Sequence, residues 1–111
     1  MHGHNVTIAQ DGDTSTPVDV WGQRVVGIAM SAAWTAGNIT FEASWNPDAG
    51  TPVWGAVVDT DGGPVTVTAP AAGEWVMIPI DLLAGVRYLR LVSSVSQEAA
   101  RTLVVVTRPV V

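Results

Sequence analysis

Short apolar runs separated by Gly, Pro and Asp repeat along the whole chain. Residues 38–44 show the clearest alternation, because Ile39, Phe41 and Ala43 fall on one face and polar residues on the other. A period of two is typical of a strand that is buried on one side. The same kind of pattern predicts further strands over 5–10, 17–21, 24–30, 53–59, 65–69, 74–80, 86–92 and 101–108.

One predicted strand differs from the others because it is apolar on both faces. In residues 24–30, Val25 and Ala29 lie opposite Val26, Ile28 and Met30. A strand without a polar face suits a central position that is covered on both sides. The run 17–21 begins with Pro17 and fits a short edge strand, where a missing N–H is tolerated.

Turn signals separate the strands at short intervals and define the fold class. Strong turns are expected at 46–50 and 59–64, and a single helical turn at 81–85 with Asp81 as its N-cap. Many short strands with regular turns predict an all-β fold, a single antiparallel β-sandwich of about eight strands. Jelly-roll-like and Ig-like strand orders share this local pattern. We expect one domain over 1–111, with a short N-terminal arm at about 1–5.

Composition narrows the kinds of partner. Of the 111 residues, 48% are hydrophobic and 14% are charged, so neighbouring subunits are expected to cover part of the apolar surface. The net charge is −5 and the five basic residues, all Arg, are scattered, which argues against nucleic acid as a partner. No run is apolar enough for a membrane helix and no signal peptide is visible, so synthesis in the cytoplasm is expected.

Residues that carry catalytic chemistry are scarce. There is no Cys, and the two histidines, His2 and His4, lie at the N-terminus, where a serine triad cannot use them. The spacing of the carboxylates does not indicate a glycosidase pair. The His-x-His pair could ligate a metal, but an unstructured or docking arm is the favoured interpretation. We therefore expect a protein that is not an enzyme and has no cofactor.

Tryptophans are the strongest candidates for a binding role. Trp21, Trp34, Trp45 and Trp54 lie in predicted loops or at strand ends. Loop tryptophans stack on sugars or anchor protein interfaces, although core and subunit-contact positions are favoured here. Arg90 is a further candidate for an interface or ligand contact, and an ion pair with Glu42 or Glu74 is its simpler role.

Two acidic turns are candidates for calcium. Each places two carboxylates one residue apart, Asp11 and Asp13 in the first turn and Asp59 and Asp61 in the second. Calcium takes six to eight oxygen ligands, and such loops supply some of them. Asp-Gly is also the commonest turn chemistry, and a plain turn without metal is the favoured interpretation.

Four segments distributed over the chain after residue 24 carry a family resemblance: 25–36, 39–44, 83–90 and 99–109. They resemble small virion structural proteins of tailed phages and prophages. The resemblance implies a virion protein made in the host cytoplasm, a capsid decoration, head spike or fibre. Its implied partners are copies of itself and other virion proteins such as the major capsid protein.

A shorter resemblance supports an alternative. Residues 84–91 resemble a late strand of discoidin-like and other jelly-roll carbohydrate-binding domains, in which a small residue precedes an Arg-Tyr-aliphatic-Arg-aliphatic strand, here residues 87–91. This resemblance implies a carbohydrate-binding module that attaches to host glycans. Neither resemblance implies a site residue that can be carried over.

Overall fold

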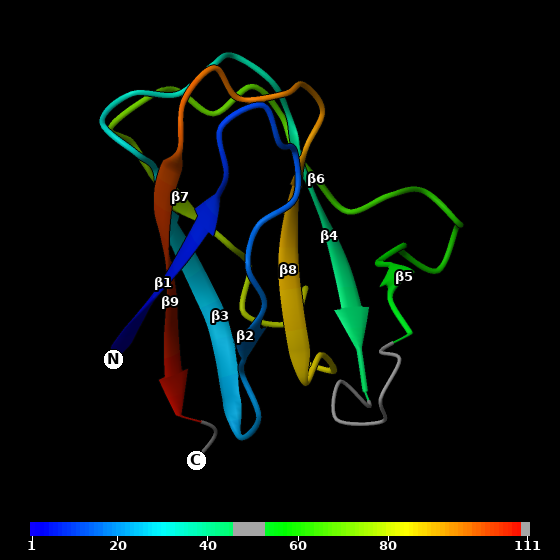
Figure 1. The fold of residues 1–111 in the computed structure, drawn as a ribbon. Helices are drawn as coiled ribbons and strands as arrows, with labels where there is room; N and C mark the ends of the chain where they lie inside the picture. The colour runs from blue at the N-terminus through cyan, green and yellow to red at the C-terminus, as the bar shows by residue number, and fades with distance from the viewer. Residues whose placement is uncertain (46–52, 110–111) are drawn as a thin grey trace.

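The computed structural model describes residues 1–45 and 53–109, which form nine strands (Figure 1). Each of the nine predicted runs overlaps one of them. The turn expected at 46–50 lies outside the described residues. The strands are β1 (His2–Ile8), β2 (Val18–Asp19), β3 (Gln23–Ala29), β4 (Ile39–Ser44), β5 (Gly55–Ala56), β6 (Thr66–Val67), β7 (Trp75–Met77), β8 (Tyr88–Ser93) and β9 (Arg101–Pro109).

The strands form two antiparallel sheets packed face to face, which confirms the predicted β-sandwich. Sheet A has the order β1-β9-β3-β7, and sheet B has the order β2-β8-β4-β5, with β6 also paired to β4. The pairing is nested: the first strand pairs with the last, β2 with β8, β3 with β7, and β4 with β5 and β6. A nested hairpin folded over into two sheets is the winding of a jelly roll. An Ig-like order would instead place the first two strands side by side.

The expected N-terminal arm at 1–5 is wrong, because these residues belong to β1. The strand pairs with β9 from His2 opposite Thr107 to Ile8 opposite Arg101. Its inward polar side chain, His4, has partners: Nε2 lies 3.2 Å from Gln23 Oε1 and 3.1 Å from Thr107 Oγ1. Polar residues on the inner face hid the alternation in the sequence, and this cluster satisfies them.

The helical turn expected at 81–85 is also wrong. The segment forms two hydrogen-bonded turns, in which Leu82 N–H donates to Pro79 O at 3.0 Å and Val86 N–H donates to Leu83 O at 3.3 Å. The turns place Leu83 in the core with 1% of its surface exposed. In the described part of the chain no helix is long and apolar enough to cross a membrane.

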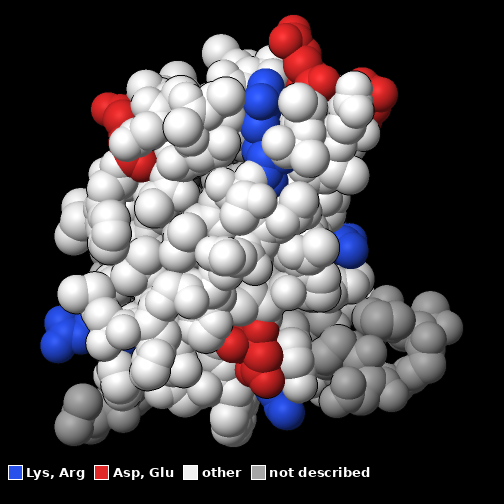
Figure 2. Space-filling view, turned by 60° about the vertical axis from the view of Figure 1, so that its left-hand side comes forward, with Lys and Arg blue, Asp and Glu red and all other residues white. Residues whose placement is uncertain are grey.

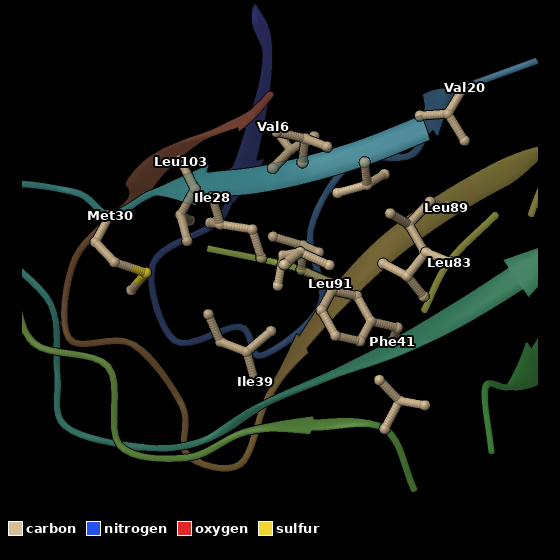
Figure 3. Packing of buried hydrophobic residues seen from close by; sticks show 14 of the residues in the cluster. Val6, Val20, Ile28, Met30, Ile39, Phe41, Leu83, Leu89, Leu91 and Leu103 are labelled. Carbon is tan, nitrogen blue, oxygen red and sulfur yellow. The ribbon is translucent and has the colours of Figure 1, made fainter. Parts of the chain in front are cut away.

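The core lies between the two sheets (Figure 3). Sheet B contributes Phe41, Leu89 and Leu91, which point toward Ile28 and its neighbours on sheet A. The alternation predicted for 38–44 places Ile39 and Phe41 inside as expected. Burial of side chains of this size stabilises the fold by about 1.5–3 kcal/mol each, so the two rows of facing residues hold the layers together.

Gln97 ties the loops at one end of the sandwich together and is fully buried. Its amide nitrogen donates to Thr35 O and to Ser93 Oγ, both at 3.1 Å, and its Oε1 accepts from Thr35 N–H at 2.9 Å. Its backbone N–H donates to Gly12 O, and its carbonyl accepts from Asp11 N–H. The side-chain amide therefore joins the 31–38 loop to the end of β8, and the backbone of the same residue holds the 9–14 turn.

Replacing Gln97 should destabilise the protein more than its size suggests. In Gln97→Leu the N–H and C=O of half-buried Thr35 and the buried Ser93 hydroxyl lose their partner, and we expect a loss of about 2–4 kcal/mol in the free energy of unfolding. Urea denaturation of the variant and the parent protein measures this change in the free energy of unfolding. Exposed Gln10 is the matched control, and Gln10→Leu should change stability by less than about 0.5 kcal/mol. Equal effects at both positions would contradict the role of the network.

Candidate functional site

The outer face of sheet B is polar, as expected for a sheet that meets water. Glu42 of β4 lies opposite Arg90 of β8, and Thr40 lies opposite Val92. Arg90 Nε and Nη2 each lie 2.6 Å from Glu42 Oε1, and the guanidinium lies 4.3 Å from the centre of the Trp54 ring. The pairing with Glu42 is one of the two that the sequence suggested. The pair and the indole form one stacked cluster that leaves Arg90 already partnered.

The outer face of sheet A is apolar over β3, β7 and part of β9, in contrast to sheet B, while Asn5, Thr7 and Thr102 make its β1 side polar. Ile28 and Val105 point into the core, so their strand neighbours point outward, and Gly27 lies beside both Met77 and Val106 on that side. Ala29 likewise lies beside Trp75 and Val104. We call this outward surface the apolar face; its members are Val26, Gly27, Ala29, Trp75, Met77, Val104 and Val106.

A groove of about 710 Å³ adjoins the apolar face at Val26, Trp75 and Met77. Its remaining border includes Met1, Ile80 and Arg108. Met77 is 72% exposed and Trp75 is 52% exposed, although both lie on a strand. In Figure 2, where the strands of sheet A come forward, the middle of the surface is a broad uncharged area, with charged groups above, below and to the sides. Exposed apolar area of this kind marks interaction surfaces.

Trp75 lies flat on the apolar face because Gly27 leaves room for it. A Cβ at Gly27 would lie 2.6 Å from Trp75 Nε1 and 3.2 Å from Val76 O, closer than packing allows. The indole therefore covers the backbone of β3, and Val106 beside Gly27 is only 6% exposed although it points outward. Gly27 therefore allows the Trp75 indole to lie against β3.

A second hollow, of about 460 Å³, lies at the end of the sandwich where β4 finishes and β8 begins (Figure 1). Trp21, Trp45 and Arg87 line it together with Ala43 and Ser44; we call it the end pocket. Trp21 is 69% exposed and Trp45 is 76% exposed. The geometry thus brings together two of the predicted tryptophans and an arginine from three separate chain segments.

Local turn chemistry places Trp21 at the rim of the end pocket. The Asp19 carboxylate accepts a hydrogen bond from Trp21 N–H at 2.9 Å, and Gly22 takes a φ of 73°. A left-handed glycine after an Asp turn reverses the chain between β2 and β3. The indole at the tip of this turn is held out toward solvent instead of folding into the core.

The remaining candidate residues lie apart from the end pocket. Trp54 is part of the Arg90 cluster, and Trp34 is half-buried against the core. Its indole Nε1 is buried and has no hydrogen-bond partner in residues 1–45 and 53–109. The tryptophans therefore do not form one continuous platform.

The acidic turns use their oxygens within the turns themselves. Asp59 Oδ1 accepts from the N–H groups of Asp61 and Gly63 at 2.9 and 3.0 Å, and Asp13 Oδ1 accepts from the Thr14 hydroxyl at 2.9 Å. Asp11 takes a φ of 63° and donates its N–H to Gln97 O. Over the described ranges, no three His, Cys, Asp or Glu side chains form a group that could hold a metal ion.

Sequence reasoning missed Trp75, Met77 and Arg87 as surface residues. A signal for the first two was present, because 74–80 is apolar on both faces, as is 24–30. When two strands with two apolar faces lie side by side in a two-layer fold, one face of the pair packs on the other sheet. The opposite apolar face has no second sheet to cover it. The local pattern places Arg90 with Tyr88 on the outer face of β8, whereas Arg87 precedes the strand and its position beside Trp21 depends on a contact between remote segments.

The Arg90 cluster should contribute measurable stability. A double-mutant cycle of Glu42→Gln and Arg90→Gln should give a coupling of about 1 kcal/mol, because both side chains are about 70% buried and share the Trp54 ring. The Arg24–Asp81 pair is the control, since its N–O distance is 3.3 Å and Asp81 is 86% exposed. Urea unfolding of the parent and the six variants should show weaker coupling for the Arg24–Asp81 pair; equal couplings would refute the distinction.

Gly27→Ala should destabilise the protein by about 1–3 kcal/mol, because its methyl group collides with the Trp75 indole. The loss should shrink in a Trp75→Ala background, where the indole is absent. Gly55→Ala is the control, as nothing lies within 4 Å of its added Cβ. Thermal unfolding measures all four variants. If Gly27→Ala destabilises the Trp75→Ala protein as much as the parent, the collision is not with the Trp75 indole.

No protein-family model, no curated protein and no solved structure matches this chain.

Proposed function

We propose that this protein is a non-enzymatic structural protein of a virion, which assembles with copies of itself through the apolar face. The observation that carries the proposal is the outer side of sheet A, where apolar residues of three strands and the groove beside them lie open. The resemblance to virion proteins of tailed phages supports the setting, in which a capsid decoration, head spike or fibre also meets the major capsid protein.

Burial of the apolar face is energetically favourable. Removing apolar surface from water stabilises a complex by about 25 cal/mol per Å². Trp75 and Met77 are the largest exposed apolar side chains on the described strands of sheet A. Aromatic and Met residues are enriched at protein interfaces, where they fill partner grooves. The groove of about 710 Å³ beside them provides a matching concave surface on the same molecule.

A second copy of the chain fits this surface better than a charged partner. In the described residues the groove is bordered by one charged side chain, Arg108. With a net charge of −5, two copies repel over most of their surface, and an uncharged face is where that repulsion is least. The contact is face to face, because the exposed apolar side chains point outward from the sheet. At the β7 edge, a strand of three residues followed by Pro79 also disfavours edge-to-edge strand addition.

The test is the mass of the purified protein by light scattering from about 1 µM to 1 mM, a range that covers binding free energies of roughly −8 to −4 kcal/mol. We expect a dimer or larger closed assembly. Met77→Glu places a charge in the buried contact and should give a monomer with an unchanged circular dichroism spectrum.

Val58→Glu is the matched control, because Val58 is also an exposed apolar residue, 51% accessible, and lies outside the groove. It should assemble like the parent protein. A parent chain that stays monomeric at the highest concentration would refute the self-assembly proposal, and so would loss of assembly in both variants alike.

A further inference from the structure

The end pocket combines exposed aromatic rings with an arginine. Trp21 and Trp45 supply exposed aromatic surface, and Arg87 supplies a positive charge between the strands. A volume of about 460 Å³ falls within the roughly 300–1,000 Å³ of small-molecule sites. The pocket is therefore large enough for a small ring and its substituents.

The charge of Arg87 is available to a ligand. In the described part of the chain, the ion pairs are Arg24 with Asp81 and Arg90 with Glu42, and Arg101 donates to Gln97 and Thr35. The Arg87 guanidinium instead lies 4.9 Å from the centres of both the Trp21 and the Tyr88 rings. Stacking uses the faces of a guanidinium and leaves its N–H groups free in the plane.

An arginine fixed by two aromatic rings is preorganised for a planar anion. Because the rings already hold the side chain, little conformational entropy is lost when an acceptor binds. A carboxylate matches the fork of the guanidinium and accepts two hydrogen bonds from it. The protein is acidic overall, so a ligand carrying a single negative charge is favoured over a polyphosphate.

We propose that the end pocket binds a carboxylate-bearing saccharide, such as a hexuronate or a sialic acid. The apolar C–H face of the sugar ring packs on an indole of Trp21 or Trp45, and the carboxylate pairs with Arg87. The pocket is formed by the β2–β3 turn, the end of β4 and the start of β8, and it shares no lining residue with the groove of the apolar face. The proposal therefore does not depend on self-assembly.

The experiment is titration of the full chain with three probes, followed by isothermal calorimetry and by saturation-transfer NMR. A glucuronic-acid disaccharide and sialyllactose carry the carboxylate, and lactose is the neutral counterpart. We expect both acidic probes to bind at least about tenfold more tightly than lactose, the advantage of one charge-assisted pair. If only one acidic probe binds, the site is assigned to that class of acid.

Variants separate recognition from folding. Arg87→Gln should abolish the preference for the acidic probes, and Trp21→Ala should weaken binding of every probe. Arg108→Gln and Trp75→Ala are the matched controls, an exposed arginine and an exposed tryptophan outside the end pocket, and should bind like the parent protein. Thermal unfolding of each variant verifies that it folds.

Three results would overturn the proposal. One is equal binding of lactose and sialyllactose, and another is full binding by Arg87→Gln. The third is the absence of saturation transfer from either acidic probe at about 10 mM, a concentration above the millimolar limit of useful affinity. Since monomer and oligomer expose the same end pocket, failure of the mass measurement above leaves this result unaffected.

Discussion

The nested pairing of the strands is the constraint on which the rest of the structure depends. Because β1 must pair with β9, and β2 with β8, the connections collect at the two ends of the sandwich. At one end Gln97 joins them by hydrogen bonds. At the other end, the β2–β3 turn lies beside the last residues of β4 and the segment before β8. These three segments line the end pocket. Residues 21, 45 and 87 are neighbours only in this strand order.

The two outer faces show how the same packing is used in different ways. On sheet B, the cross-strand pair of Glu42 and Arg90 with Trp54 satisfies the charges within the chain. On sheet A, small residues at Gly27 and Ala29 and the flat Trp75 ring leave a smooth apolar surface. A sheet with one solvated side alternates in polarity. Sheet A departs from that rule over strands β3, β7 and β9, which is why we assign it a partner.

The local pattern of apolar and polar residues predicts where the strands lie, but it does not predict which residues meet in the end pocket. The alternation in 38–44 and the apolar run 24–30 predict β4 and a central β3, because side-chain direction in a strand follows from sequence spacing alone. The first residues of the N-terminal strand were assigned to an arm because His4 faces inward and is satisfied by Gln23 and Thr107, which are distant in sequence. Strand order and the meeting of Trp21 with Arg87 likewise depend on contacts between remote segments, which periodicity does not encode.

The exposure of Met77 has a consequence for the chemistry of the apolar face. A thioether that is 72% accessible to solvent is open to oxidation, and the sulfoxide is polar and chiral where the thioether is apolar. The core methionine, Met30, is only 7% exposed and is protected by the sheets around it. Oxidants therefore reach Met77, and Met1 at the border of the groove, which is 81% exposed, before they reach Met30. The surface that we assign to assembly is altered before the core, and a methionine sulfoxide reductase would restore it.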